Sequence, residues 1–154
     1  ATYNEGENIV ALIHEIHKQV PYADILVVDD NSPDGTGRLV DELSQKDPRV
    51  RALHRAGKMG LGTAIIAAMR YAIAHDYDLA LNMDADFSHP PRYLPALVES
   101  MSKYDVTIGS RYTKGGGTQN WPLSRRFMSK GVNFVVRFLF RMGVKDASGG
   151  LRCY

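Results

Sequence analysis

Apolar segments that stop abruptly at acidic or polar residues are the feature of this sequence that most constrains its fold. Three runs end in this way: 25–28 at Asp29-Asp30, 79–83 at Asp84-Ala85-Asp86, and 106–108 at Gly109-Ser110-Arg111. Short continuous apolar runs are typical of strands buried on both faces of a parallel sheet. Open α/β sheets bind ligands beyond the carboxyl ends of their strands. We therefore expect four acids and an arginine to gather at one edge and form a site.

Helix-like segments alternate with these strands. Apolar residues recur at helical spacing within 6–19, and further helices are predicted over 36–46, 61–74 and 91–103. An additional strand is predicted over 50–54. This alternation predicts an α/β fold, with a mainly parallel sheet flanked by helices, in a single domain that spans residues 1–154.

Charge is distributed unevenly along the chain. Residues 1–110 contain 10 Lys and Arg against 16 Asp and Glu, whereas residues 111–154 contain nine against one acid, Asp146. Such asymmetry indicates contact with a polyanion or a membrane surface; the alternative is a solvated basic face. No apolar run reaches the ~18 residues needed to cross a bilayer. The single cysteine, Cys153, favours a reducing compartment, and a chain that opens at Ala1 is expected to be part of a longer one.

The Asp84-x-Asp86 pair follows an apolar strand and predicts a metal site. Two carboxylates at a strand end can face one hard cation, and Mg²⁺ or Mn²⁺ prefers oxygen ligands and keeps diphosphate oxygens in its shell. The alternative is a turn in which Asp86 caps the next helix. His89 is a candidate third ligand or phosphate donor, or a loop histidine packed on proline.

Three further segments carry candidate ligand contacts. Asp29 and Asp30 can accept hydrogen bonds from a nucleobase or ribose, while the turn that follows them can equally be a cap. The glycines after Arg55 and Lys58 allow close approach of a phosphate to a helix start; the alternative is an ordinary turn. Arg111 suits the charge of a departing diphosphate, or makes a surface salt bridge.

A basic amphipathic helix is predicted at about 124–142. On a helical projection one stripe carries polar and basic residues, namely Arg126, Lys130, Asn133, Arg137 and Arg141. Large apolar residues, Phe127, Phe134 and Phe138 among them, cover the other side. This pattern is typical of a helix that lies at a membrane surface. The alternative is a helix whose apolar side faces the core.

Six motifs in order along the chain resemble one family. They are Thr2-Tyr3-Asn4-Glu5, Val28-Asp29-Asp30-Asn31-Ser32-Pro33-Asp34-Gly35-Thr36, Gly60-Leu61-Gly62-Thr63-Ala64, Met83-Asp84-Ala85-Asp86-Phe87-Ser88-His89-Pro90, Gly109-Ser110-Arg111-Tyr112 and Ser148-Gly149-Gly150-Leu151-Arg152-Cys153-Tyr154. Together they resemble the dolichol-phosphate mannose synthases, which are family 2 glycosyltransferases with a GT-A fold. Where some relatives place a metal-binding glutamine, this chain has Ser88.

The resemblance implies a role for each matching residue. The implied nucleotide-sugar site consists of Tyr3, Glu5, Val28, Asp29, Asp30, Asp84, Ala85, Asp86 and Arg111. Within it, Asp84 and Asp86 would hold Mg²⁺ or Mn²⁺, and Asp86 and Arg111 would be the catalytic residues. The acceptor phosphate would lie against Ser124, Arg125, Arg126 and Ser129.

The expected reaction is transfer of mannose from GDP-mannose to a dolichyl or polyprenyl phosphate. Such an acceptor is already anionic, so it needs charge neutralisation and no strong base, and we expect direct displacement with inversion. We expect the chain to act on the cytoplasmic side of a membrane, without a nucleic-acid partner. Three alternatives remain: a UDP-sugar-dependent polyprenyl-phosphate glycosyltransferase on the same fold, a non-catalytic nucleotide or phosphate-binding module, and a basic membrane-docking module without an enzymatic role.

Overall fold

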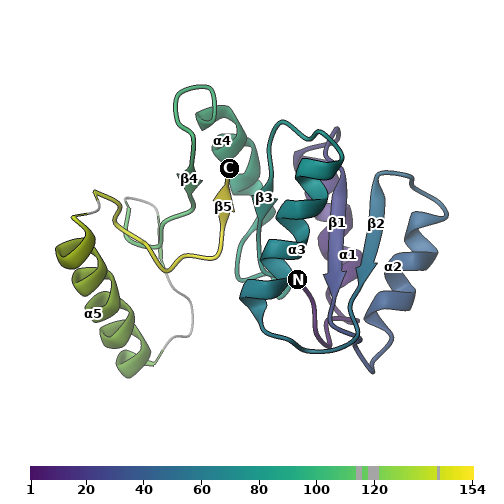
Figure 1. Ribbon diagram of the computed structural model, residues 1–154, viewed down its shortest axis with the longest axis horizontal. Coiled ribbons are helices and arrows are strands. Elements are labelled where there is room, and N and C mark those ends of the chain that lie inside the picture. The colour runs from purple at the N-terminus through teal and green to yellow at the C-terminus, as the bar shows by residue number, and fades with distance from the viewer. Residues whose placement is uncertain (114–115, 118–121, 142) are drawn as a thin grey trace.

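The computed structural model describes residues 1–113, 116–117, 122–141 and 143–154, with only the backbone of Arg125 (Figure 1). The amino-terminal part alternates helices with strands, as α1 (Ile9–Gln19), β1 (Ile25–Asp29), α2 (Thr36–Ser44) and β2 (Val50–His54). The two strands pair in parallel, from Ile25 opposite Val50 to Asp29 opposite His54. Thr2 adds a parallel bridge beside Asp29, so the first residues of the chain lie at the carboxyl end of β1.

The remaining elements form a second sheet and its helices. In chain order they are α3 (Leu61–Ala74), β3 (Leu81–Asn82), the short helix η1 (Pro91–Tyr93), α4 (Leu94–Ser100), β4 (Thr107–Ile108), α5 (Leu123–Phe140) and β5 (Arg152–Cys153). The strand order is β3-β5-β4, and β5 runs antiparallel to both neighbours. The α/β fold expected from the sequence is therefore confirmed, with one parallel pair and one small antiparallel sheet in place of a single sheet.

Strand β5 was not predicted, and two other elements are shorter than expected. The strand expected over 79–83 is limited to Leu81–Asn82, and the helix expected over 91–103 is divided into η1 and α4 and ends at Ser100. The pairing of β5 extends beyond its two residues, because Tyr154 and Ala80 exchange backbone hydrogen bonds of 3.0 Å in both directions. This pairing brings the end of the chain beside the strand that precedes Asp84.

The apolar core lies between α1, the strands and α4. Its most buried members include Ile13, Val40, Val50 and Cys153. In the part of the chain that the structure describes, α5 contributes no residue to this core. Figure 1 shows α5 at one end of the molecule, apart from both sheets.

Candidate active site

The turn after β3 presents the two acids of the Asp84-x-Asp86 pair. Ala85 between them is buried at 8% exposure and anchors the turn in the core, whereas the Asp86 side is exposed. The backbone N–H of Asp84 donates to His89 Nδ1 at 3.1 Å, and the same nitrogen lies 3.7 Å from a carboxylate oxygen of Asp84. Since Nδ1 accepts this bond, His89 supports the backbone of the turn. Its candidate role as a third ligand or phosphate donor stays a prediction.

Asp86 is held as a carboxylate by its own turn. Burial opposes its ionisation, but hydrogen bonds from Ser88 outweigh burial and lower the pKa of Asp86 below its ordinary value. One of these is the backbone N–H of Ser88, 2.9 Å from Asp86 Oδ1. Ser88 therefore orients the Asp86 carboxylate.

The acids at this turn fit a hard divalent cation by the chemistry of their donor atoms. The Asp84 side chain is 43% exposed, so its oxygens are accessible, and carboxylate oxygens are the ligands that Mg²⁺ prefers. No group of three or more metal-binding side chains occurs among the residues that the structure describes. The residues present thus suit a cation whose other ligands are substrate oxygens and water.

Gly150 allows the carboxyl-terminal segment to pass close to this turn. A Cβ atom at residue 150 would lie 3.1 Å from the His89 ring and 3.3 Å from an Asp84 oxygen. Asn82 fixes the approach by donating its side-chain N–H to the Gly150 carbonyl at 2.8 Å. The segment that contains residues 146–150 is therefore part of the site.

Asp29, at the end of β1, is saturated by internal hydrogen bonds. Its Oδ1 accepts from the hydroxyls of Thr2 at 3.0 Å and Ser32 at 2.5 Å, and its Oδ2 accepts from the Ser32 backbone. Val28 is 1% exposed, and its carbonyl accepts from the Thr2 backbone. Both residues position the turn in this structure, and the nucleoside contacts predicted for them stay predictions that this arrangement does not support.

Asp30 differs from Asp29, because its carboxylate forms an ion pair with Arg55. The two side chains are 8% and 6% exposed, and Arg55 Nε lies 3.0 Å from Asp30 Oδ1. The N–H is nevertheless not aligned for a hydrogen bond: among the described residues, Asp30 Oδ1 and Arg55 Nε and Nη1 have no hydrogen-bond partner. Buried polar atoms of this kind are rare and are costly unless a ligand or water satisfies them. Asp30 and Arg55 therefore have binding capacity that the fold does not use.

Residues 2–5 run along this part of the site. The Asp30 N–H donates to the Thr2 carbonyl at 3.1 Å, and the Glu5 N–H donates to the Thr36 hydroxyl at 2.9 Å. Tyr3 is 40% exposed and its ring lies 4.4 Å from the ammonium of Lys58. The segments around Thr2, Asp29-Asp30 and Arg55 thus meet at the carboxyl end of β1. The common edge expected for these acids with Asp84, Asp86 and Arg111 stays a prediction.

Arg111 is engaged by an acid that the site prediction did not include. Its Nε and Nη2 donate to the two oxygens of Asp146 at 2.7 and 2.6 Å, and its backbone N–H donates to the same carboxylate at 3.0 Å. These bonds raise the pKa of Arg111; burial opposes ionisation of Asp146, but the bonds outweigh it and hold its pKa below the ordinary value. The phosphate contact predicted for Arg111 stays a prediction.

The acceptor residues predicted on α5 are only partly linked to this site. Ser124 and Arg126 are exposed, Ser129 Oγ accepts from the Tyr112 hydroxyl at 2.7 Å, and the Arg125 side chain lies outside the described residues. Asn133 is 4% exposed, and its carbonyl accepts from the Ala147 backbone at 2.7 Å. Asn133 and Tyr112 therefore connect α5 to the rest of the site.

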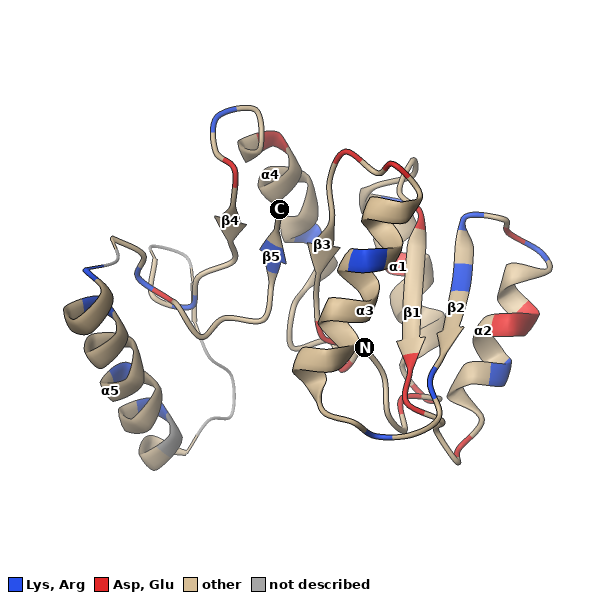
Figure 2. Cartoon of the chain, viewed as in Figure 1, with Lys and Arg blue, Asp and Glu red and all other residues tan. Residues whose placement is uncertain are grey.

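The apolar side of α5 faces away from the core. Phe127, Phe134 and Phe138 are 82%, 70% and 74% exposed, which contradicts the alternative of a core-facing helix. In Figure 2 the ribbon of α5 carries blue segments at Lys and Arg positions and no red ones. Within the described ranges, no helix combines the length and apolar character needed to cross a bilayer.

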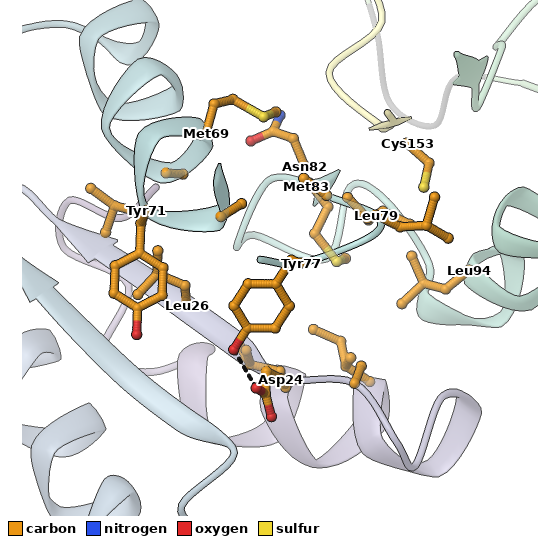
Figure 3. A pocket seen from close by; sticks show the side chains of 18 of the residues that line it. Asp24, Leu26, Met69, Tyr71, Tyr77, Leu79, Asn82, Met83, Leu94 and Cys153 are labelled. Atoms are coloured by element: carbon orange, nitrogen blue, oxygen red, sulfur yellow. Dashed lines mark hydrogen bonds between the residues drawn. The ribbon is translucent and has the colours of Figure 1, made fainter. Parts of the chain in front are cut away.

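A cavity lies between β1, α3 and β3 (Figure 3). Its volume is about 500 Å³, and apolar side chains such as Met69, Met83 and Leu94 line most of it. Tyr77 and Asp24 meet at the amino-terminal end of β1, where the hydroxyl donates to the carboxylate. This cavity belongs to the core between the two sheets.

Comparison with known proteins identifies relatives of this chain. It is 44% identical over 155 residues to polyprenol monophosphomannose synthase of Mycolicibacterium smegmatis, matching 99% of this chain and 58% of the relative. It is 42% identical over 153 residues to undecaprenyl-phosphate mannosyltransferase of Micrococcus luteus, matching 99% of this chain and 63% of the relative. It is also 42% identical over 139 residues to dolichol-phosphate mannosyltransferase of Pyrococcus furiosus, matching 88% of this chain and 38% of the relative.

The chain thus spans less than two thirds of the length of these relatives. The family model described as glycosyl transferase family 2 matches residues 1–154, the range over which the acidic turn, the buried Asp30–Arg55 pair and the Asp146–Arg111 pair are built. On this match and on its α/β fold, the chain belongs to glycosyl transferase family 2.

Proposed function

We propose that this chain is the catalytic part of an enzyme that transfers mannose from GDP-mannose to a polyprenyl phosphate of the dolichol type. The observation that carries the proposal is the turn after β3, which presents Asp84 and Asp86 with accessible carboxylates, in a chain of family 2. Three relatives whose names specify mannose and a polyprenol, undecaprenol or dolichol phosphate support the sugar and the acceptor.

The donor would bind along the carboxyl ends of β1 and β3. Asp30 and Arg55 have buried polar atoms without partners in the described structure, and these suit the hydroxyl and amide groups of a nucleoside. Tyr3, with Lys58 over its ring, offers an aromatic face and a cation to the base and phosphates. Asp29 and Val28 would act through the backbone position of Thr2, and Glu5 through the turn that its N–H anchors to Thr36 at 2.9 Å.

The acidic turn would hold the donor diphosphate. Asp84 and Asp86 would bind Mg²⁺ or Mn²⁺, which when bound neutralises charge on the departing nucleotide. His89 keeps the Asp84 backbone in place by accepting its N–H, and the Ser88 N–H orients the Asp86 carboxylate. Ala85 anchors the turn in the core.

The acceptor would approach from the side of α5. Its phosphate monoester is anionic near neutral pH and attacks the anomeric carbon directly, so the configuration inverts and no side chain need remove a proton. Arg111, fixed in orientation by Asp146, would lower the repulsion between the two phosphates. Ser124, Arg125, Arg126 and Ser129 would guide the acceptor phosphate, and the exposed apolar side of α5 would lie on the cytoplasmic surface of a membrane.

The test is a transfer assay on the full-length protein. Radiolabelled GDP-mannose, Mn²⁺ and a polyprenyl phosphate should give a labelled lipid, and Asp86→Ala should abolish it. Asp78→Ala, which removes an exposed acid before β3, is the matched control and should keep activity. Label that appears only with a UDP-sugar would move the enzyme to the alternative donor, and a sugar trapped covalently on the protein would exclude direct displacement.

A further inference from the structure

A second pocket, lined by basic side chains, lies beside α5. None of the residues that line it was assigned above to the donor or the acceptor. It has a volume of about 240 Å³ and is lined by Tyr112, Lys130, Asn133, Phe134, Arg137 and Lys145. Two cations come from α5, and Lys145 comes from the segment that follows the helix. The pocket therefore lies between α5 and the segment of the chain that leads to Asp146.

The position of Asn133 explains why cations line this pocket. Asn133 bonds to Ala147 and Ser148, which turns its side of α5 toward residues 143–148. Lys130 and Arg137 are three residues before and four residues after it, so they share that side of the helix. The basic stripe of α5 thus faces a groove of the protein, while Phe127 and Phe138 project to the outside.

No acid neutralises the pocket in the part of the chain that the structure describes. The ion pairs found there include none formed by Lys130, Arg137 or Lys145. Asp146, the single acid of residues 111–154, is 1% exposed and bound to Arg111. Three cations around one small pocket match the charge of a phosphate group.

We propose that this pocket binds the headgroup phosphate of an anionic phospholipid and so docks α5 on the membrane. The apolar wall supports a lipid as the source of the phosphate, because Phe134 lines the pocket and is also 70% exposed. A helix at a membrane surface has its axis near the headgroups, with apolar residues below and cations at phosphate level. This inference goes beyond the proposed function, since the lipid bound here is not the acceptor.

Vesicle flotation of the full-length protein tests the pocket. Vesicles of phosphatidylcholine are compared with vesicles that contain 30% phosphatidylglycerol by design, roughly the anionic content at which basic segments respond. The pocket variant is Lys130→Gln/Arg137→Gln/Lys145→Gln. The matched control is Arg38→Gln/Arg70→Gln/Lys103→Gln, which removes the same charge from exposed positions on α2, α3 and the loop after α4.

We expect the pocket variant to lose binding to anionic vesicles by roughly 100-fold, at about fivefold for each cation near the surface, and the control to lose less than about threefold. If both variants lost vesicle binding equally, net charge alone would explain the effect and the proposal would be wrong. Melting temperature checks that both variants fold, and GDP titration should give the wild-type affinity in both, which separates this outcome from a failure of the proposed donor site.

Inorganic phosphate tests the other source of the same chemistry. At constant ionic strength we expect added phosphate to leave flotation with anionic vesicles unchanged, because the apolar wall contributes to lipid binding alone. If phosphate released the wild-type protein from the vesicles, the pocket would be a site for a free anion, and the proposal that it binds a phospholipid headgroup would be wrong. A companion variant, Phe134→Ser, should weaken binding to anionic vesicles while keeping all three cations, and unchanged binding would also contradict the proposal.

Discussion

Two buried arginine–aspartate pairs near the site have opposite relations to their surroundings. Asp146 accepts from the Arg111 side chain at 2.6 and 2.7 Å and from its backbone at 3.0 Å. Asp30 and Arg55 are in contact at 3.0 Å, but Asp30 Oδ1 and Arg55 Nη1 have no partner in the described structure. The comparison shows that the one acid of residues 111–154 stabilises the fold. In residues 1–110, by contrast, Asp30 has a carboxylate oxygen without a hydrogen-bond partner in the described structure, which is available to a ligand.

The strongest test of this difference is Asp84→Asn. The substitution keeps the shape of the turn and the Asp84 N–H bond to His89 but removes charge from a side chain that is 43% exposed. We expect transfer activity to fall about 1,000-fold, or roughly 4 kcal/mol in the barrier, with little change in melting temperature. Asp78→Asn is the control, and a parallel loss of stability in Asp84→Asn would make this acid structural too.

Asp146→Asn should show the reverse pattern. It leaves the buried Arg111 guanidinium without its counter-charge, and we expect a loss of about 3 kcal/mol in the free energy of unfolding, measured in urea. That is the lower end for a broken buried pair, because 21% of the Arg111 side chain is exposed. Asp105→Asn, at an exposed loop position, is the control; an unchanged midpoint for Asp146→Asn would remove the structural role.

The pH dependence of that loss follows from the lowered pKa of Asp146. The pair stabilises the fold above the ordinary pKa of 3.8, and this contribution disappears as the pH falls through the lower folded-state pKa. Wild type and Asp146→Asn should therefore differ fully at neutral pH and approach each other only in strong acid. A difference that already vanishes near pH 5 would contradict the assignment.

The edge that carries the acids could be predicted from the sequence because its signals are local. The apolar run 25–28 ends at Asp29 and the run 79–83 ends at Asp84, so the strands and their carboxyl ends follow from neighbouring residues. The roles of Asp29 and Asp30 could not be told apart in this way. Thr2 and Arg55, which make the difference, lie 27 and 25 residues away and meet these acids only through tertiary contacts.

The carboxyl-terminal part was harder to predict for a related reason. Strand β5 has two residues and exists through its pairing with β3 and β4, which no local pattern reveals. Asp146 meets Arg111 across 35 residues. The helical projection identified the basic and the apolar side of α5 but not which of them faces the protein. Helices usually turn their apolar side inward, whereas in α5 the buried residue is Asn133.

Replacing both members of the Asp30–Arg55 pair sharpens the comparison. In Asp30→Asn/Arg55→Met both charges are removed, so no unpaired charge stays buried, and we expect the free energy of unfolding to change by less than about 1 kcal/mol. Affinity for GDP, measured by calorimetry, should fall about tenfold because the polar atoms offered to the nucleoside are gone. Wild-type affinity in a folded double variant would show that this pair does not serve the donor.

The smallest expected effect concerns the attachment of α5. Asn133→Ala removes the bonds to Ala147 and Ser148 and leaves the partly buried Ala147 N–H without its acceptor, which costs about 1 kcal/mol. Because α5 adds nothing to the described core, this loss should appear as faster hydrogen exchange in α5, with the strands around Asp84 unaffected. Gln45→Ala, at an exposed end of α2, is the control. Faster exchange spread evenly over both sheets would mean that the two halves unfold as one unit, and the contrast between their acids would then not extend to their stability.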